Sequence, residues 1–242
     1  MLKWLGAGEP LPPVEAALRD PNGLLCAGGE LTPERLLEAY RHGVFPWYSG
    51  GEPILWWSPD PRMVLYCAEL KVSRSLDKNR RNKRYELRID TAFREVLAGC
   101  AGPRAGSGAT SADGGGTWLG EDMRRAYARL HRAGHAHSFE TWRDGELVGG
   151  LYGVAIGRMF YGESMFSRAT DASKVALLGL VAELRARGFP LIDCQVRTPL
   201  LAALGAREIP RRAFLRELAA LVHYDEPPGR WTRTTEPNVP AE

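Results

Sequence analysis

Three adjacent strand signals limit the fold of this chain more than any other feature of its sequence. They cover Ala136 to Trp142, Leu147 to Ile156 and Met159 to Met165, and the turns between them fall at Asp144-Gly145 and Gly157. An Asp-Gly pair between two strand-like segments is a strong signal for a tight hairpin. The segment therefore predicts an antiparallel meander of three strands.

A helix and a further strand follow the meander. Ala172 to Arg187 is a long apolar helix ended by Gly188, and Leu191 to Val196 is a short buried strand. Strands followed by a crossover helix and another strand indicate an α+β domain with helices packed on a sheet. The remaining signals predict strands at Met63 to Cys67 and Tyr85 to Ile89, a helix opening at Ser73, and helices over Ala92 to Ala101 with Thr91 as cap, Glu121 to Arg132, Leu200 to Leu204 and Arg211 to Val222.

The first 60 residues are different in character, because they are rich in Pro, Gly and Trp. Their clearest element is a helix from Pro33 to His42, with Thr32 as its cap, and turns are expected around it. The proline-locked aromatic segments around Trp47 and Trp56 are rigid enough to display a ring, although packing between domains is the usual fate of such rings. We expect a small N-terminal α/β domain over residues 1–61, a larger domain over 62–235 and a disordered tail over 236–242.

Composition excludes several classes of protein. The 242 residues are 44% hydrophobic and 25% charged, as in a soluble globular chain. No run of 18 apolar residues occurs, and prolines and glycines interrupt the first 18 positions, so we expect no membrane span, no signal peptide and a cytoplasmic location. The four cysteines are widely spaced without a Cys-x-x-Cys pair, which favours reduced thiols.

Positive charge gathers in one segment. Residues 71–88 hold eight Lys or Arg against Asp77 and Glu86, whereas the net charge of the whole chain is +3. Two interpretations stay open: a solvated helix face, or a surface for a polyanion such as RNA, held through phosphates without reading base sequence. The candidate RNA-binding residues are Lys71, Arg74, Lys78, Arg80, Arg81, Lys83 and Arg84.

Common catalytic patterns are absent from the sequence. No Gly-x-Ser-x-Gly motif occurs, and no glycine-rich segment matches a P-loop or a dinucleotide fingerprint. His135 and His137 face the same side of a predicted strand, but no third metal ligand has a matching spacing, so a hydrogen-bonded pair is the simpler interpretation. Cys194 has no cationic neighbour in sequence to lower its pKa. We therefore expect neither a metal site nor a cysteine nucleophile.

Two short segments carry the polar groups that favour chemistry. Residues 161–167 place Glu163 among small residues, Met and Phe, and Asp193 and Gln195 lie two apart on the short strand. Alternate residues of a strand share one face, so the acid and the amide are expected to converge on one substrate atom. Carboxylates and an amide beside apolar side chains suit a small apolar group attached to something polar.

These segments, with several others, resemble the bacterial leucyl/phenylalanyl-tRNA-protein transferase family from about Asn22 to Phe214. The matching blocks are Asn22-Gly23-Leu24-Leu25, Gly43-Val44-Phe45-Pro46-Trp47, Trp56-Trp57-Ser58-Pro59-Asp60-Pro61-Arg62, Gly134-His135-Ala136-His137-Ser138, Leu147-Val148-Gly149-Gly150, Gly162-Glu163-Ser164-Met165-Phe166-Ser167, Ala172-Ser173-Lys174 and Ile192-Asp193-Cys194-Gln195.

The resemblance implies a fold and an activity. It implies a small N-terminal domain and a C-terminal domain with an N-acetyltransferase-like (GNAT-like) fold, in which helices flank a mostly antiparallel sheet. It also implies transfer of Leu or Phe, and less readily Met, from aminoacyl-tRNA to proteins with N-terminal Arg or Lys, which marks them for N-end-rule degradation. The implied partners are Leu-tRNA, Phe-tRNA and such proteins, with no cofactor and a monomeric enzyme as the default.

The resemblance also assigns site residues, with Trp47 and Trp118 beside the terminal adenosine. Around the aminoacyl side chain it places Leu151, Phe160, Met165, Leu180 and Ile192. Near the reacting amine it places Glu163, Asp193 and Gln195. The chain departs from the family pattern at Leu200, where a histidine is usual, and in its longer loop over residues 102–116.

Our hypothesis for the reaction is that Asp193 steers and helps deprotonate the amine. In that hypothesis Gln195 orients the amine, and Glu163 contributes to recognition of Arg or Lys. Two alternatives remain at the level of sequence. A CoA-dependent N-acetyltransferase would share the fold, but residues 167–171 lack the paired glycines of a pyrophosphate loop. A non-catalytic RNA-binding module would leave the polar residues of the site unexplained.

Overall fold

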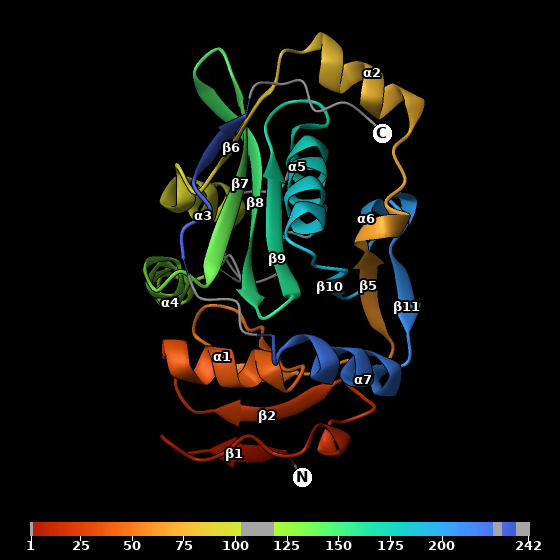
Figure 1. The fold of residues 1–242 in the computed structure, drawn as a ribbon. Helices are drawn as coiled ribbons and strands as arrows, with labels where there is room; N and C mark the ends of the chain where they lie inside the picture. The colour runs from red at the N-terminus through yellow and green to blue at the C-terminus, as the bar shows by residue number, and fades with distance from the viewer. Residues whose placement is uncertain (1, 103–118, 225–228, 236–242) are drawn as a thin grey trace.

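The computed structural model describes residues 2–102, 119–224 and 229–235, and these residues form two sheets with helices between and around them (Figure 1). The small sheet consists of β1 (Lys3–Leu5), β2 (Leu24–Gly28), β3 (Phe45–Pro46) and β4 (Leu55–Trp57). The large sheet consists of β5 (Arg62–Tyr66), β6 (Glu86–Ile89), β7 (Ala136–Arg143), β8 (Glu146–Ile156), β9 (Met159–Ser167), β10 (Leu191–Gln195), β11 (Arg207–Ile209) and β12 (Arg233–Thr235).

The helices agree closely with the sequence prediction. They are α1 (Pro33–Arg41), α2 (Arg74–Asn82), α3 (Phe93–Ala101), α4 (Glu121–Arg132), α5 (Ala172–Ala186), α6 (Pro199–Ala203) and α7 (Arg211–Leu221), with short 3-10 helices at Val14–Ala16 and Cys67–Glu69. Their periodic apolar faces and their stop signals were readable without tertiary information. None of the helices in the described part of the chain is long and apolar enough to cross a membrane.

The large sheet confirms both the meander and the α+β class. Its strand order is β11-β5-β10-β9-β8-β7-β6-β12. β7, β8 and β9 pair antiparallel in sequence order, as predicted. β10 returns through α5 to pair parallel with β9, and every other described pair of this sheet is antiparallel. The parallel pair is important because a cavity lies where its two strands, β9 and β10, separate.

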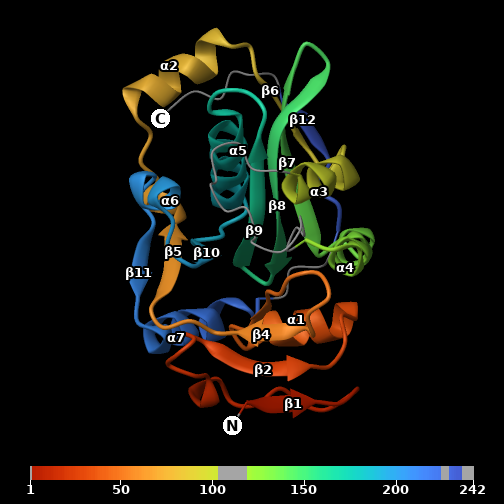
Figure 2. The same cartoon turned by 180° about the vertical axis from the view of Figure 1, so that it is seen from behind.

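Helices cover both faces of this sheet, with α5 on one side and α3 and α4 on the other (Figures 1 and 2). Two adjacent glycines of β8 explain why α5 and α3 can come so close to the sheet. A Cβ on Gly149 would lie 2.5 Å from Cβ of Ala172 in α5, and one on Gly150 would lie 3.2 Å from Val96 in α3. Since successive strand residues point to opposite faces, the pair lets both helices approach the sheet.

The N-terminal segment corrects the expectation of turns around a single helix. β1, β2, β4 and β3 form a four-stranded sheet in that order, with β1 and β2 parallel. These strands span two to five residues each, too short for a period of two to be recognised. α1 and α7 lie between this sheet and the large one (Figures 1 and 2).

One predicted helix cap is wrong. Thr32 caps α1 as expected, because its side chain accepts a hydrogen bond from the Arg35 backbone N–H. Thr91 does not cap α3 in that way, since Ala92 occupies the cap position and makes no side-chain hydrogen bond there. The buried carboxylate of Glu140 instead accepts hydrogen bonds from the backbone N–H groups of Thr91 and Ala92, at 3.0 and 2.8 Å, and from the Thr91 hydroxyl. A strand residue from β7 thus supplies the cap.

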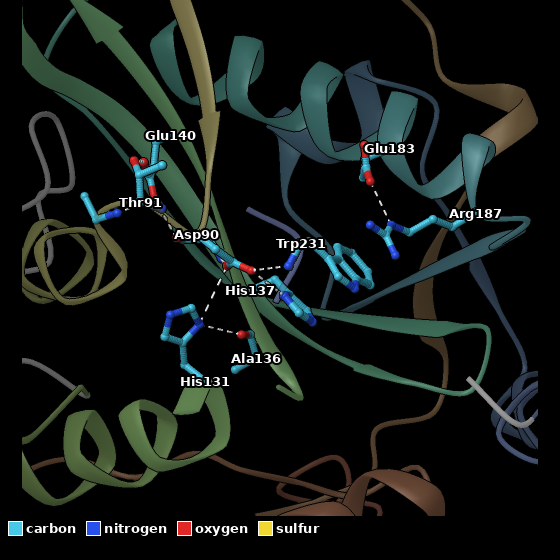
Figure 3. A network of polar contacts seen from close by, with 11 residues as sticks. Asp90, Thr91, His131, Ala136, His137, Glu140, Glu183, Arg187 and Trp231 are labelled. Carbon is cyan, nitrogen blue, oxygen red and sulfur yellow. Dashed lines mark hydrogen bonds and ion pairs between the residues drawn. The ribbon is translucent and has the colours of Figure 1, made fainter. Parts of the chain in front are cut away.

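The C-terminal segment returns to the far edge of the large sheet, where β12 pairs with β6 (Figure 2). Trp231, just before β12, is 6% exposed, stacks on His137 with ring centroids 3.9 Å apart, and donates its backbone N–H to Asp90 (Figure 3). His137 is hydrogen-bonded to the same carboxylate at 2.8 Å. Burial alone would raise the pKa of Asp90, but these hydrogen bonds leave it below its usual value. The buried network fastens the chain end to the sheet.

Candidate active site

A cavity opens where β9 and β10 separate. Their parallel pairing ends at Tyr161 and Asp193, and the residues that follow on each strand turn toward the space between them. Gly162 and Glu163 on β9, and Cys194 and Gln195 on β10, line this space. The cavity therefore lies at the carboxyl ends of the two parallel strands, a common position for ligand sites in sheets with helices.

The cavity has a volume of about 860 Å³, enough for a ligand larger than one side chain. Five of the apolar residues that the resemblance implies for the donor site line this cavity, namely Trp47, Leu151, Met165, Leu180 and Ile192. Helix α5 adds Leu177, and α6 adds Leu200 and Leu201. At the position where the family usually has a histidine, this chain thus gives the wall an apolar side chain.

Two predicted site residues do not line the cavity, and a third is not described. Phe160 is fully buried in the core, where it pairs across the strands with the cavity-lining Ile192. Asp193 is also fully buried, and its neighbours on β10 line the cavity instead. Trp118, together with the loop over residues 103–116 and the tail over 236–242, lies outside the described residues.

A chain of hydrogen bonds surrounds Glu163, the one carboxylate among the described lining residues. Oε2 of Glu163 accepts from the Tyr127 hydroxyl at 2.6 Å, and Oε1 accepts from Nε2 of Gln195 at 2.9 Å. The Tyr40 and Tyr127 hydroxyls lie 2.7 Å apart, so Tyr40 completes the chain behind them. Burial raises the pKa of Glu163 to about 7, while the hydrogen bonds from the tyrosines and Gln195 act in the opposite direction.

The arrangement of Asp193 and Gln195 differs from the sequence expectation. The register of β10 shifts between these two residues, and Gln195 has a φ of 63°, in the left-handed region. This irregularity sends the two side chains to different places, so they do not converge on one substrate atom. Oδ1 of Asp193 instead accepts the Gln195 backbone N–H at 2.9 Å, which holds the unusual backbone conformation.

Asp193 is paired with Arg62 in the core. Nε of Arg62 donates to Oδ1 of Asp193 at 2.8 Å and Nη2 donates to Oδ2 at 2.6 Å, and both side chains are fully buried. The guanidinium also lies between the rings of Phe45 and Phe214, 4.7 Å from each centroid. A bidentate pair of this kind is rigid, so Asp193 is a fixed support for Gln195 and not a group exposed to a ligand.

The other reactive groups considered from the sequence are Cys194, His135 and His137. Cys194 lines the cavity, but burial raises the pKa of its thiol far above the usual range, so the thiolate needed for nucleophilic attack is scarce. His137 is held by Asp90, and burial lowers the pKa of His135. No group of three or more His, Cys, Asp or Glu among the described residues is arranged to hold a metal ion.

Sequence reasoning missed Tyr40, Tyr127 and Arg62. The first two lie on the apolar faces of predicted helices, and a buried tyrosine hydroxyl usually finds a partner, so they carried a usable signal. Arg62 carried none, because its partner is 131 positions away in the sequence.

The basic candidates lie on and around α2. Lys71, Arg74, Lys78 and Arg84 are exposed, whereas Arg80 and Arg81 pair with Asp77 in the same helix, and Lys83 is half-buried. α2 is next to the first turn of α5, because Asn79 donates to the Asp171 carboxylate at 2.7 Å. Ser173, in that turn of α5, lines the cavity. The basic helix therefore borders one side of the site.

A largely apolar cavity that also presents a carboxylate and an amide suits a group-transfer enzyme, in which one reactant is held while a polar second reactant approaches. Comparisons with known proteins identify the family. The profile described as leucyl/phenylalanyl-tRNA protein transferase matches residues 64–219, and the profile of its N-terminal domain matches residues 29–60. The chain belongs to this family of aminoacyltransferases.

Individual relatives agree. The chain is 62% identical over 221 residues to the leucyl/phenylalanyl-tRNA-protein transferase of Thiobacillus denitrificans, with 91% of this chain and 94% of that one covered. It is 58% identical over 231 residues to that of Chromobacterium violaceum, with 96% of each chain covered. The solved structure of L-PGS from Bacillus licheniformis aligns at a TM-score of 0.39 and 11% identity, over 74% of this chain and 57% of that one, a likeness too weak to carry an argument.

Proposed function

We propose that this protein transfers Leu or Phe, and less readily Met, from aminoacyl-tRNA to the α-amine of proteins that begin with Arg or Lys. The observation that carries the proposal is that the hydrogen-bonded pair Glu163 and Gln195 lines the same cavity as a set of large apolar side chains. One reactant is an apolar side chain on a polar carrier, and the other is an amine, so a site for both needs these two parts side by side.

The apolar part suits the side chain of the donor. Leu151, Met165, Leu180 and Ile192 form a wall without hydrogen-bonding groups, so it selects by shape. A methyl group in such a pocket is worth roughly 1–3 kcal/mol, enough to disfavour β-branched Ile or Val against Leu. Discrimination among Leu, Phe and Met is expected to be weaker, since all three are unbranched at Cβ.

The polar part suits aminolysis of an ester. The amine nitrogen attacks the ester carbonyl, the bond to the ribose oxygen breaks, and the proton lost from nitrogen ends on that oxygen. With a pKa of about 7, Glu163 can accept the proton and return it at neutral pH. Because Nε2 of Gln195 donates to Glu163, the other amide atom, Oε1, is left to accept from the incoming amine. Asp193 acts indirectly, by holding Gln195.

The charge of Glu163 also favours a cationic acceptor. An N-terminal Arg or Lys brings two positive groups, the α-ammonium and the side chain, to a cavity whose one described carboxylate is Glu163. In a partly desolvated site, an opposite charge is attracted more strongly than in water. This replaces the sequence-based hypothesis in which Asp193 met the amine directly.

The tRNA body is proposed to contact the exposed cations around α2. This surface borders the first turn of α5 and hence the cavity, through the contact between Asn79 and Asp171. Contacts to phosphates would hold any tRNA without reading its anticodon. Trp47, at the rim, would stack on the terminal adenine of the same tRNA.

The proposal also covers the domain organisation, the location and the oligomeric state of the protein. We assign residues 1–61 to a small N-terminal domain and 62–235 to a GNAT-like catalytic domain, supported by the two sheets and by the two separate family profiles. A cytoplasmic, monomeric enzyme fits substrates that are tRNAs and proteins with newly exposed N-termini. The products are proteins that began with Arg or Lys and now carry an added Leu or Phe, and we propose that this addition marks them for degradation.

The test is transfer of radiolabelled Leu from Leu-tRNA to a model protein that begins with Arg, beside an identical protein that begins with Ala. Ile-tRNA serves as the donor control, and acetyl-CoA tests the acetyltransferase alternative. Transfer from Leu-tRNA to the Arg protein alone is the expected result. Binding of tRNA without transfer, or acetylation of the acceptor, would reject the proposed function.

A further inference from the structure

We propose that Trp57 is a positioning residue for the transfer site, because its indole N–H fixes the backbone of Trp47 at the cavity rim. The proposal rests on the function proposed above, in which Trp47 receives the terminal adenosine of the donor. It explains why two tryptophans follow each other in the sequence but have different surroundings in the structure. Trp56 is fully buried in the core, whereas Trp57 is partly buried and contacts Trp47, which lines the cavity.

The rim residue is held by its backbone, not by burial. Trp47 is 44% exposed, so packing alone cannot fix the direction of its ring. Its N–H donates to the Leu55 carbonyl at 2.9 Å, and its carbonyl accepts from Nε1 of Trp57 at 2.7 Å. These two hydrogen bonds hold both peptide groups of Trp47, one from the main chain of β4 and one from a side chain of β4.

The ring of Trp57 supports the same neighbour. The centroids of the Trp47 and Trp57 rings are 5.8 Å apart, with 56° between their planes, which is a favourable tilted contact. The backbone of Trp57 pairs with Phe45 on β3, and the Phe45 ring lies against Arg62, the partner of Asp193. Trp57 therefore joins the adenosine side of the cavity to the buried pair that supports Gln195.

The hydrogen bond from Trp57 lies at an exposed position, unlike the one made by its neighbour. Trp56 is fully buried and donates its Nε1–H to the Gly28 carbonyl at 2.9 Å, on the small sheet away from the cavity lining. The two tryptophans thus make the same type of bond at similar length in different surroundings. Loss of the exposed bond is expected to appear in donor binding, and loss of the part-buried bond of Trp56 in folding stability.

The chain offers a matched set of variants for the test. W57F keeps an aromatic ring but removes the N–H donor, and W57H keeps a ring N–H at the equivalent position but removes the larger ring. W56F removes the corresponding donor from the core. The measurements are kcat and KM for Leu-tRNA, and the Kd for adenosine that carries phenylalanine through a non-hydrolysable amide. The thermal unfolding midpoint of every variant is recorded beside them.

For W57F we expect KM for Leu-tRNA and Kd for the adenosine analogue to rise about three- to tenfold, with kcat within about twofold of wild type. W57H should return KM and Kd most of the way to the wild-type values, because it keeps the ring N–H. If the effect of W57F came only from lost ring packing, W57H would not restore them. W56F should lower the unfolding midpoint and leave KM and Kd unchanged. Equal KM values for W57F and wild type would overturn the proposal.

A double-mutant cycle tests whether Trp57 acts through Trp47. In a W47A background, W57F should raise KM no further, since the ring that it positions is gone. A full additional effect in that background would show an independent role and reject the positioning role. An inactive wild-type enzyme would instead reject the proposed function, and the Kd of the adenosine analogue would still decide whether Trp57 supports Trp47.

Discussion

Glu163 is the residue whose charge state should control the rate. Its pKa of about 7 means that the base form appears as the pH rises through neutrality. We predict that kcat of the wild type rises across this range. E163Q should lower kcat by about 10²-fold or more and lose that rise, keeping only the dependence due to the acceptor amine, whose pKa is roughly 7.7–8.0. The check is a pH–rate profile at saturating donor, and a profile of unchanged shape in E163Q would contradict the role.

The same raised pKa has a consequence for stability. In the unfolded chain the carboxyl group titrates near its ordinary value of 4.5, whereas in the folded protein it titrates at about 7. The folded state therefore binds the proton more tightly, and the free energy of unfolding falls as the pH rises from about 4.5 to about 7. We predict that E163Q, which does not titrate, gains stability relative to wild type across this window. Urea unfolding at pH 4.5 and pH 7.5 measures the difference, and a constant difference would contradict it.

Arg62 and Asp193 should behave as one unit. Removing either partner leaves a buried charge without compensation, which typically costs about 3–5 kcal/mol of the free energy of unfolding. We predict a loss of this order for R62A and for D193A, and a clearly smaller loss for the double variant than the sum of the two. Urea unfolding of the four proteins completes the cycle. Strict additivity would mean that the pair contributes nothing as a pair.

These residues also mark the limit of what the sequence can predict about the site. Glu163 and Gln195 are assigned to one site because their neighbours resemble a known family, and both residues line the same cavity. The separation of Asp193 from Gln195 was not predictable, since a regular strand would place both on one face. The register of β10 shifts between these two residues, and Asp193 pairs with Arg62, a distant partner that nothing local in the sequence indicates.

Long helices can be predicted from this sequence more accurately than very short strands. α4 was expected at Glu121–Arg132 and begins and ends there, and α5 was expected within one residue of its observed end. Both have long apolar stripes, for which periodicity is informative. β3 is two residues long and exists because β4 pairs with it, so its conformation is set by a tertiary contact.

α2 is the element that we expect to bind the tRNA body. Reversal of Lys71, Lys78 and Arg84 to Glu should weaken binding and reduce the salt slope by about 2–3, roughly one for each phosphate that is no longer neutralised. These three side chains are exposed and stand outside the pairs that Asp77 makes with Arg80 and Arg81. Filter binding of Leu-tRNA at several salt concentrations gives the slope.

The matched control changes the net charge equally on a different surface. It reverses Arg129, Arg132 and Arg216, which are exposed on α4 and α7, away from α2 (Figures 1 and 2). This variant should keep most of the salt slope of the wild type. Equal losses in both variants would indicate general attraction by net charge and place no contact on α2.

At the scale of the whole molecule, long-range contacts bind the first and last parts of the chain to the large sheet. Tyr161 of β9 donates its hydroxyl to the Tyr40 carbonyl of α1 at 2.9 Å, and Tyr40 reaches Glu163 through Tyr127. At the opposite edge, Trp231 packs among Phe139, Phe160 and Phe189. Residues from α1 and from the segment before β12 therefore both pack on the large sheet that carries the site.

The C-terminal contact can be tested by its contribution to stability. W231A removes a ring that is 6% exposed, leaves His137 without its stacking partner, and takes away the ring 4.4 Å from the Arg187 guanidinium. Loss of a large buried aromatic ring typically costs about 3–5 kcal/mol, and we predict a loss of this order in the free energy of unfolding. R230A, at the exposed preceding position, should change it by less than about 0.5 kcal/mol.

Urea unfolding at pH 7 compares W231A and R230A with wild type. Because Trp231 packs against Phe160, the cross-strand neighbour of the cavity-lining Ile192, the W231A protein that remains folded should also bind the donor less selectively. The ratio of kcat/KM for Phe-tRNA and Leu-tRNA measures this, since a loss of folded protein lowers both values alike and leaves their ratio unchanged. A loss of stability below about 1 kcal/mol would mean that the C-terminal segment contributes little to the fold. A large loss of stability with an unchanged kcat/KM ratio would mean that the C-terminal segment contributes to stability alone. Donor selectivity would then be set by the residues that line the cavity.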